Sequence, residues 1–339
     1  MQVLVYYGAP FMSMPDQNAA AGLPAARATP PREPERIPLY RFASPRYWAV
    51  WLGIVIVRLV NALPLPAQMS IGRATGRLAF LFSRRDRRVA DINIGLCLPE
   101  LDTAERRALL KRHFESLGCA LYETGLVWWA SDARLRRLIE FQGVEHLRDA
   151  LARGRGALML SAHFTPLEMG ARGLTLLGPT SIMYLTPGNA LIAELSRRGR
   201  TRHTVQAISS DQIRDLLQNL KNNLPVWYAP DQRFTDKNSE LVPFFGQPAS
   251  SNVATSRLAK ISRAVVLPYF PARRADNRGY IIQIHPPFEN FPSEDAIADT
   301  QRFHELIEAH VRRYPEQYLW AYKRFRREGF DPYRPAADG

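Results

Sequence analysis

The sequence predicts an α/β protein in which a mixed, mostly parallel sheet is flanked by helices. Two observations carry this prediction. From about residue 100, short apolar runs alternate with segments of helical periodicity, which is typical of strand–helix–strand units. Of the 339 residues, 46% are hydrophobic and 23% are charged, a composition that builds a sizeable core. The length suits one or two globular domains, and we expect the main one over residues 67–330.

The individual elements follow from periodicity and from helix-start signals. Asp102 followed by Glu105 is a helix-start pattern, and apolar residues then recur at helical spacing as far as Leu121. The expected strands cover residues 157–161, 181–185, 205–208, 226–229, 264–270 and 280–285. The expected helices cover residues 166–177, 189–198, 211–221, 252–262 and 296–313.

The two ends of the chain differ from this domain. Residues 1–43 are rich in Ala and Pro and predict a disordered extension, and residues 331–339 predict a short tail. Residues 44–66 carry the strongest apolar run, which Arg58 interrupts. Because about 20 residues span a bilayer as a helix, we expect a membrane helix here, with Arg58 reaching toward the headgroups. A helix lying in the interface and a buried core helix are the alternatives.

The chain is strongly basic, with a formal net charge of +13. This charge favours an anionic partner, either a nucleic acid, an anionic membrane surface, or an acidic or phosphorylated molecule. The cluster Arg84–Arg88 follows the apolar run, which places the bulk of the protein on the cytoplasmic side if that run is in the membrane. Taken alone, the cluster also fits a solvated surface. Cys97 and Cys119 have no metal-type spacing and predict buried free thiols.

A candidate catalytic pair lies between the first expected strand and the helix after it. His163 falls in the strand-to-helix loop, and Glu168 falls in the first helical turn. With His163 in the loop, the chain can fold the imidazole back toward the carboxylate, which would fix the tautomer of a general base. Such a base can deprotonate a hydroxyl that attacks a thioester. The alternative is structural, because Thr165 and Glu168 also form a capping-box pattern with Pro166 at the first helical position.

Beyond this pair, the sequence carries further motifs in a fixed order. They are Pro45–Trp48, Asn93–Pro99, Phe114–Gly118, Glu123–Gly125, His163–Glu168, Arg198–Arg200, Trp227–Gln232, Val242–Gly246, Pro315–Trp320 and Lys323–Arg326. In this order and over residues 44–328, the chain resembles the late acyltransferases of lipid A biosynthesis, the lauroyl and myristoyl transferase family. The resemblance also extends to the wider group of glycerolipid acyltransferases with a His-X4-acid motif.

The resemblance implies roles for four residues. His163 is expected to be the general base, Glu168 its partner, and Arg200 and Asp231 are expected to be substrate-binding or oxyanion-stabilising residues. From the residues alone, Arg200 lies in a basic run that suits a phosphate or an oxyanion, or forms a solvated helix end. Asp231 follows a strand and can bind hydroxyls, orient an arginine or cap its loop.

The family resemblance further implies the partners and the place of the reaction. The donor is expected to be acyl-acyl carrier protein, and the acceptor a lipid A precursor bearing Kdo sugars, at the cytoplasmic side of the bacterial inner membrane. Glu168 rather than Asp, together with the segments Trp227–Asp231 and Pro315–Trp320, resembles the lauroyl branch. The resemblance implies no metal, no nucleotide cofactor and no nucleic acid. The sequence also contains no Gly-rich phosphate loop of the nucleotide-binding type.

One departure from the family and several alternatives stay open. The family has Tyr-Arg-Pro where this chain has Tyr184–Pro187 without an arginine, so this substrate contact is either lost or supplied by another basic residue. Myristoyl or palmitoleoyl transfer in the same pathway is the first alternative, and a glycerophospholipid acyltransferase is the second. A basic membrane-surface or nucleic-acid-binding protein without catalysis is the alternative of a different class.

Overall fold

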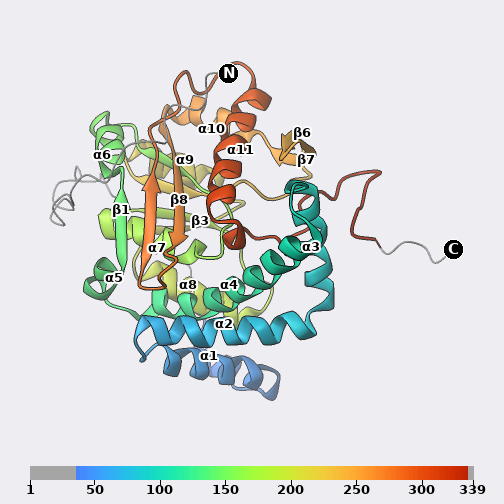
Figure 1. The fold of residues 1–339 in the computed structure, drawn as a ribbon. Coiled ribbons are helices and arrows are strands. Elements are labelled where there is room, and N and C mark those ends of the chain that lie inside the picture. The colour runs from blue at the N-terminus through green and yellow to red at the C-terminus, as the bar shows by residue number, and fades with distance from the viewer. Residues whose placement is uncertain (1–35, 335–339) are drawn as a thin grey trace.

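The computed structural model describes residues 36–334 and has an α/β architecture built on one seven-stranded sheet (Figure 1). The sheet strands are β1 (Ile139–Gln142), β2 (Ala157–Leu160), β3 (Ser181–Tyr184), β4 (Gln206–Ser209), β5 (Pro225–Tyr228), β8 (Val265–Arg273) and β9 (Tyr280–Ile284). A separate antiparallel hairpin consists of β6 (Ser239–Phe244) and β7 (Gln247–Asn252).

Eleven α-helices and three short 3-10 helices surround the strands within the described residues. The α-helices are α1 (Trp48–Val60), α2 (Leu65–Phe82), α3 (Arg84–Cys97), α4 (Thr103–Trp129), α5 (Asp132–Leu138), α6 (Val144–Ala152), α7 (Leu167–Leu177), α8 (Ala190–Thr201), α9 (Ile213–Lys221), α10 (Ala254–Ser262) and α11 (Ala296–Arg313). The 3-10 helices are η1 (Leu39–Phe42), η2 (Pro45–Tyr47) and η3 (Pro315–Gln317).

The strand order confirms the expected mixed, mostly parallel sheet. The order is β1-β9-β8-β2-β5-β3-β4, and only β8 and β9 pair antiparallel. Consequently β2, β5, β3, β4 and β8 all run in one direction, and their carboxyl ends meet at one edge. In open sheets of this kind, ligands bind outside the carboxyl ends of the strands.

Both faces of the sheet are covered, which explains why the central strands are apolar throughout. In β2, Ala157 and Met159 join the core that α5, α6 and α7 cover, whereas Leu158 and Leu160 join the core beneath α9, α10 and α11. Side chains alternate between the faces of a strand, so a strand buried on both sides has no polar positions. The six strands expected from such runs are all present, with ends shifted by at most a few residues.

Neither the strand β1 nor the β6–β7 hairpin was predicted from the sequence. β1 lies at the sheet edge and alternates buried Ile139 with exposed Glu140, so its apolar signal is weak. The hairpin strands pair Pro243 with Pro248 and are rich in Ser, neither of which is typical of a strand. β1 was missed because it is short and alternating, and the hairpin because Pro243 interrupts the apolar residues of β6 and β7 has few of them.

The long helix α4 begins as the sequence predicted. The Asp102 side chain accepts hydrogen bonds from the N–H groups of Ala104 and Glu105, and the Glu105 carboxylate accepts one from the N–H of Asp102. The expected cap at Thr165 is wrong, since α7 begins at Leu167 with no side-chain cap. The Thr165 hydroxyl is bonded elsewhere, to Ser116 Oγ at 2.6 Å.

The N-terminal apolar run forms two helices instead of the expected membrane-spanning helix. Among residues 36–334, no helix is both long enough and apolar enough to cross a membrane. α1 has 13 residues, or about 20 Å of helix, against a hydrocarbon thickness of about 30 Å. The helix ends at Asn61, whose side-chain amide donates to the carbonyl of Tyr122 and to Gln68, and Pro64 then precedes α2.

The ends of the described chain lie against the domain. In the segment expected to be disordered, residues 1–35 fall outside the described residues, but η1 brings Phe42 into contact with Tyr47 and with Leu191 of α8. In the expected tail, Tyr333 is buried and its hydroxyl donates to Asn93 Oδ1 at 2.6 Å. Cys97 and Cys119 are buried free thiols, as expected.

Helices α2 and α4 pack closely because glycines line their contact, at the lower side of the view in Figure 1. A Cβ on Gly118 of α4 would lie 2.1 Å from the carbonyl oxygen of Gly72 and 2.5 Å from the nitrogen of Gly76. These neighbours are backbone atoms, so they cannot move aside without separating the helices. The position therefore tolerates only glycine.

We expect Gly118→Ala to lower the free energy of unfolding by about 2 kcal/mol or more, because an added methyl group overpacks the contact. Gly53→Ala on α1 is the matched control, since a Cβ there meets nothing within 4 Å. The control should leave stability unchanged or raise it by about 1 kcal/mol through helix propensity. Chemical denaturation of both variants measures the difference, and equal stabilities would contradict the close packing.

Candidate active site

His163 and Asp231 meet at the carboxyl edge of the sheet. β2 ends at Leu160 and β5 at Tyr228, and the two strands are paired neighbours, so the residues that follow them lie side by side. The N–H of His163 donates to Asp231 Oδ2 at 3.0 Å, and its Nδ1 lies 2.6 Å from Asp231 Oδ1. The carboxylate thus holds both the backbone and the ring of His163.

The charge of Asp231 decides which nitrogen of His163 carries the proton. Burial opposes ionisation of Asp231, but the attraction of His163 and the two hydrogen bonds from it outweigh burial and lower the pKa of Asp231. An ionised carboxylate only accepts hydrogen bonds, so Nδ1 carries a proton, and in the neutral imidazole Nε2 then has the lone pair. The Asp231 side chain is 2% exposed and that of His163 is 21% exposed, so solvent reaches the histidine and not its partner.

Two residues from the C-terminal segment support Asp231, one of them aromatic and the other basic. The Tyr318 hydroxyl donates to Asp231 Oδ2 at 3.4 Å, and Arg324 contributes to the lowering of the pKa of Asp231. Arg324 is buried and donates to the carbonyl oxygen of Ser250 at 2.7 Å and to Ser251 Oγ at 2.6 Å. Arg324 of the motif Lys323–Arg326 thus lies inside the protein and supports the site from there.

Glu168 lies in the first turn of α7, as expected, but its bonds go to Arg200. The carboxylate pairs with Arg200 Nη2 through Oε1, and Nε lies 3.4 Å from Oε2. The hydrogen-bond partner of the His163 ring is Asp231, not Glu168. Neighbouring strands bring Asp231 to His163 although 68 residues separate them, whereas Glu168, only five residues away, turns toward α8.

Arg200 comes from the last turn of α8 and is held on two sides. Besides Glu168, its guanidinium lies over the ring of Tyr184 at the end of β3, 5.0 Å from the centroid. The Arg200 side chain is mostly buried, so it is not the solvated helix end that the sequence also allowed. The segment after Tyr184, where the resemblance led us to expect an arginine, begins with exposed Leu185. Arg200 is thus a basic group in contact with Tyr184.

All four residues named from the sequence lie beside the carboxyl edge formed by β2, β5 and β3, as two pairs, His163–Asp231 and Glu168–Arg200. No group of three or more His, Cys, Asp or Glu residues suited to a metal ion occurs among residues 36–334. The arrangement provides a histidine with a free Nε2 and an orienting carboxylate, which suits general base catalysis.

Comparison with known proteins connects this site with an enzyme family. The sequence model described as bacterial lipid A biosynthesis acyltransferase matches residues 38–327. The chain belongs to this family. A lipid A acyltransferase is an enzyme, so the non-enzymatic alternative is wrong.

Individual relatives of this lipid A acyltransferase carry different acyl-chain names. The lipid A biosynthesis lauroyltransferase of Escherichia coli K12 is 36% identical over 283 residues, which cover 83% of this chain and 92% of the relative. The palmitoleoyltransferase of the same organism is 35% identical, with coverage of 84% and 93%. The myristoyltransferase of that organism is 27% identical, with coverage of 83% and 88%.

Sequence reasoning missed Tyr318 and Arg324 as parts of the site. They follow Asp231 by 87 and 93 residues, and no spacing rule connects them with it. In the sequence, Pro315–Trp320 and Lys323–Arg326 stand out only as family motifs. Their approach to Asp231 depends on the tertiary fold, through an isolated bridge between Phe164 and Tyr318.

Asp231→Asn should give the largest loss of turnover among substitutions that keep the shape of the site. We expect turnover to fall by about 10²–10⁴-fold, because the amide does not hold the required tautomer or stabilise the imidazolium.

The same substitution also tests the ionisation of Asp231. Since the pKa of Asp231 is lowered by folding, its charge stabilises the protein above the unfolded-state pKa of about 3.9. This stabilisation is lost as the pH falls through the folded value. The stability difference between wild type and Asp231→Asn should therefore shrink as the pH falls from about 5 to about 3. A difference that stays constant over this range, measured by denaturation, would contradict the ionised pair.

Proposed function

We propose that this enzyme transfers a fatty acyl chain, most simply lauroyl, from acyl-acyl carrier protein to a lipid A precursor of the (Kdo)2-lipid IV(A) type. The observation that carries the proposal is the His163–Asp231 pair at the carboxyl edge of the sheet, in a chain that belongs to the lipid A acyltransferases. The acceptor group is a hydroxyl on an existing 3-hydroxyacyl chain, and lipopolysaccharide biosynthesis is the pathway.

In the proposed reaction, Nε2 of His163 takes the proton of the acceptor hydroxyl as its oxygen attacks the thioester carbonyl. A new ester C–O bond forms, the C–S bond breaks, and the proton passes from the imidazolium to the departing thiolate of the donor. Asp231 stabilises the imidazolium in between. No covalent enzyme intermediate and no metal take part.

We assign Arg200 to the developing negative charge or to an acceptor phosphate, and Glu168 to holding Arg200. Two observations support this assignment. Glu168 fixes Nε and Nη2 of Arg200, while Nη1 is buried without a hydrogen-bond partner among the described residues. A guanidinium that is already oriented stabilises a transition-state charge with little reorganisation.

The comparison with relatives does not decide which acyl chain the enzyme transfers. Identities of 36% and 35% to relatives named for lauroyl and palmitoleoyl transfer differ too little to decide between them. We favour lauroyl on the residues Glu168 and Trp227–Asp231, with palmitoleoyl and myristoyl transfer as alternatives. Transfer to a glycerophospholipid is a third alternative, with a different acceptor.

The test is an in vitro transfer assay with purified enzyme. Lauroyl-, palmitoleoyl- and myristoyl-acyl carrier protein are each offered with a radiolabelled tetra-acyl precursor and, separately, with lysophosphatidic acid. We expect a penta-acyl product, best with lauroyl, and a loss of about 10³-fold or more in His163→Ala. Product from lysophosphatidic acid alone would favour the glycerophospholipid alternative, and full activity of His163→Ala would refute the proposed base.

We further propose that the enzyme works at the cytoplasmic face of the bacterial inner membrane, with α1 and the end of α2 lying in the bilayer interface. No residue of α1 is buried, and its outward side carries Trp48, Leu52 and Leu59, each more than half exposed. Phe82 at the end of α2 is 81% exposed. Surface patches of this kind mark interaction sites.

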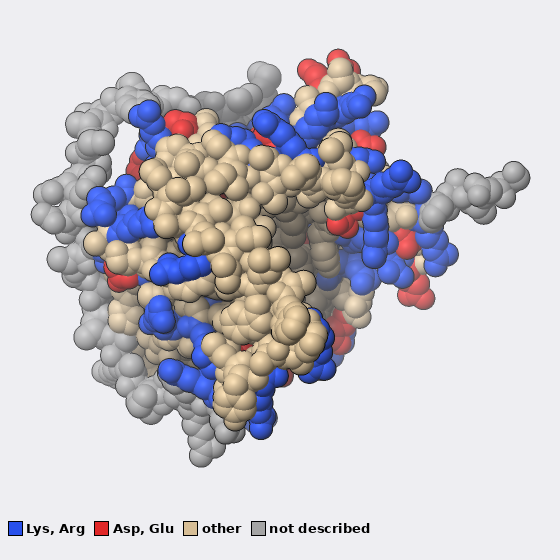
Figure 2. All heavy atoms as spheres, turned by 90° about the horizontal axis from the view of Figure 1, so that it is seen from below, with Lys and Arg blue, Asp and Glu red and all other residues tan. Residues whose placement is uncertain are grey.

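Charge supports the choice of an anionic bilayer as the occupant of this face. Figure 2 shows this face from below as a broad, mostly uncharged area, with Lys and Arg at its border and in its left part and few Asp or Glu. Arg84 and Arg85, which Ser83 separates from Phe82, are among the exposed basic residues. Such residues attract anionic headgroups by about 1 kcal/mol each near the surface.

Vesicle binding tests the proposed membrane face. The double variant Leu52→Asp/Leu59→Asp should bind vesicles containing phosphatidylglycerol at least about tenfold more weakly than wild type, because both charges would enter the interface. Leu241→Asp is the matched control, since Leu241 is 54% exposed but lies on the β6–β7 hairpin. Co-sedimentation measures binding, and equal loss in both proteins would contradict the assignment of this face.

A further inference from the structure

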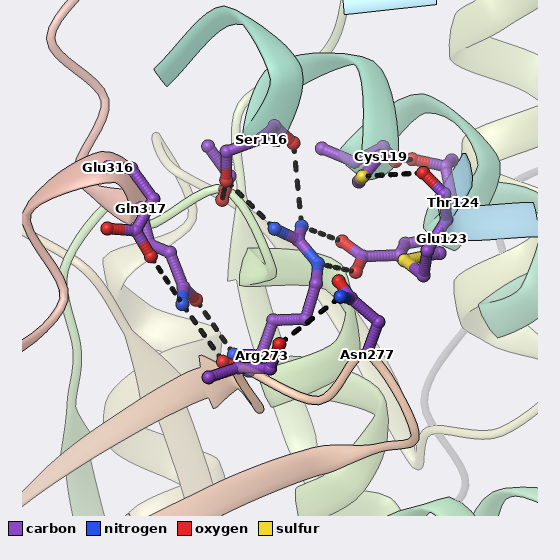
Figure 3. A network of polar contacts seen from close by, with 12 residues as sticks. Ser116, Cys119, Glu123, Thr124, Arg273, Asn277, Glu316 and Gln317 are labelled. Carbon is purple, nitrogen blue, oxygen red and sulfur yellow. Dashed lines mark hydrogen bonds and ion pairs between the residues drawn. The ribbon is translucent and has the colours of Figure 1, made fainter. Parts of the chain in front are cut away.

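A buried ion pair connects the sheet with helix α4. Arg273, at the end of β8, extends its guanidinium toward α4, where Glu123 receives it in a two-pronged contact (Figure 3). Nε lies 2.6 Å from Glu123 Oε1, and Nη2 lies 2.8 Å from Oε2. Both side chains are almost fully buried, so water does not compete for these bonds.

The same guanidinium reaches a serine about two turns earlier on α4. Arg273 Nη1 donates to Ser116 Oγ at 2.8 Å. The backbone of Arg273 is held as well, since its N–H donates to Gln317 Oε1 at 2.7 Å and its carbonyl accepts from Gln317 Nε2 at 2.9 Å. Arg273 therefore fixes both Ser116 and Gln317 (Figure 3).

Ser116 and Gln317 are also the residues that hold the turn after His163. Ser116 Oγ lies 2.6 Å from Thr165 Oγ1, and the N–H of Thr165 donates to the carbonyl of Gln317 at 2.6 Å. The carbonyl of His163 accepts from the N–H of Leu319 at 3.0 Å. The turn that carries His163 is thus bonded on one side to Asp231 and on the other to the partners of Arg273.

The use of the Thr165 hydroxyl indicates that the contact with Ser116 matters to this turn. Thr165 stands where a helix cap is expected, yet its hydroxyl bonds to Ser116 and α7 begins without a side-chain cap. Because Ser116 Oγ already accepts a hydrogen bond from Arg273, its own proton is available to Thr165. Arg273 therefore fixes the position of the Ser116 oxygen that the Thr165 hydroxyl contacts.

We propose that Arg273, Glu123 and Ser116 are positioning residues for His163, acting through the hydroxyl of Thr165. They touch no substrate. They fix the turn His163–Pro166 so that the His163 ring meets Asp231 on one side and the acceptor hydroxyl on the other. This inference rests on the proposed role of His163 as the general base, and it adds to that role a part of the protein that sequence spacing does not connect with the site.

Substitutions of Thr165 test the proposal without removing a buried charge. Thr165→Val keeps the shape of the side chain and removes the hydroxyl, whereas Thr165→Ser keeps the hydroxyl. Thr180→Val is the matched control, because Thr180 is equally buried, with its hydroxyl bonded to Gly178, at the opposite end of the sheet. Ser116→Ala and the double variant Ser116→Ala/Thr165→Val complete the set.

Two readouts separate positioning from general destabilisation. The first is turnover, for which we expect a loss of about 10–100-fold in Thr165→Val and Ser116→Ala, with KM for the acyl donor unchanged. The second is the far-downfield proton resonance of the His163 Nδ1–H bonded to Asp231, assigned by its absence in His163→Ala. It should shift in both variants, return to the wild-type position in Thr165→Ser, and stay unchanged in Thr180→Val.

The outcomes decide between the possibilities. If the hydroxyl pair is the route, the double variant loses no more turnover than either single variant. Wild-type turnover and an unshifted resonance in Thr165→Val and Ser116→Ala would overturn the proposal. A shifted resonance in an enzyme that transfers no acyl chain to any acceptor would instead refute the proposed function and leave the positioning role standing.

Discussion

The buried contact between Arg273 and Glu123 holds helix α4 and the sheet in a fixed relative position. It joins the sheet, through β8, to α4, and α4 in turn carries the helices α2 and α1. Burial opposes the charge on Arg273, but Glu123 more than compensates, so the pKa of Arg273 is raised above its usual value. Removing one partner of such a buried pair costs about 3–5 kcal/mol, because the other charge is left without compensation.

The active site follows from the order of the strands. The sheet places β5 next to β2, and so Asp231 meets His163. It also places β3 on the far side of β5. There, Arg200 lies over Tyr184 at the end of β3 and pairs with Glu168 of α7. Two acid–base pairs thus share one edge of the sheet. We assign proton transfer to the His163–Asp231 pair and a fixed positive charge to the Glu168–Arg200 pair.

The sequence was a good guide to what is local and a poor guide to pairings. Apolar runs predicted the buried strands, and Asp102 with Glu105 predicted the start of α4, because both depend on neighbours along the chain. All four proposed site residues were named. Their partners were not, since the carboxylate closest in sequence to His163 is Glu168, whereas strand order brings Asp231 to it. The apolar run over residues 44–66 predicted one helix, whereas α1 ends before Asn61. The side chain of Asn61 is bonded there to Gln68 and to the carbonyl of Tyr122, a contact that the local sequence does not reveal.

The packing of α8 ties the N-terminal segment to the chemistry. Leu191, near the start of α8, packs against Phe42 and Tyr47, Arg198 donates to the carbonyl of Ile37 at 2.7 Å, and Arg200 comes from the end of the same helix. The segment Ile37–Tyr47 therefore supports the helix that carries Arg200. Truncating the chain before α2, a common route to a more soluble enzyme, would expose Leu191 and free one side of α8. A shortened enzyme prepared in this way would report on an altered site.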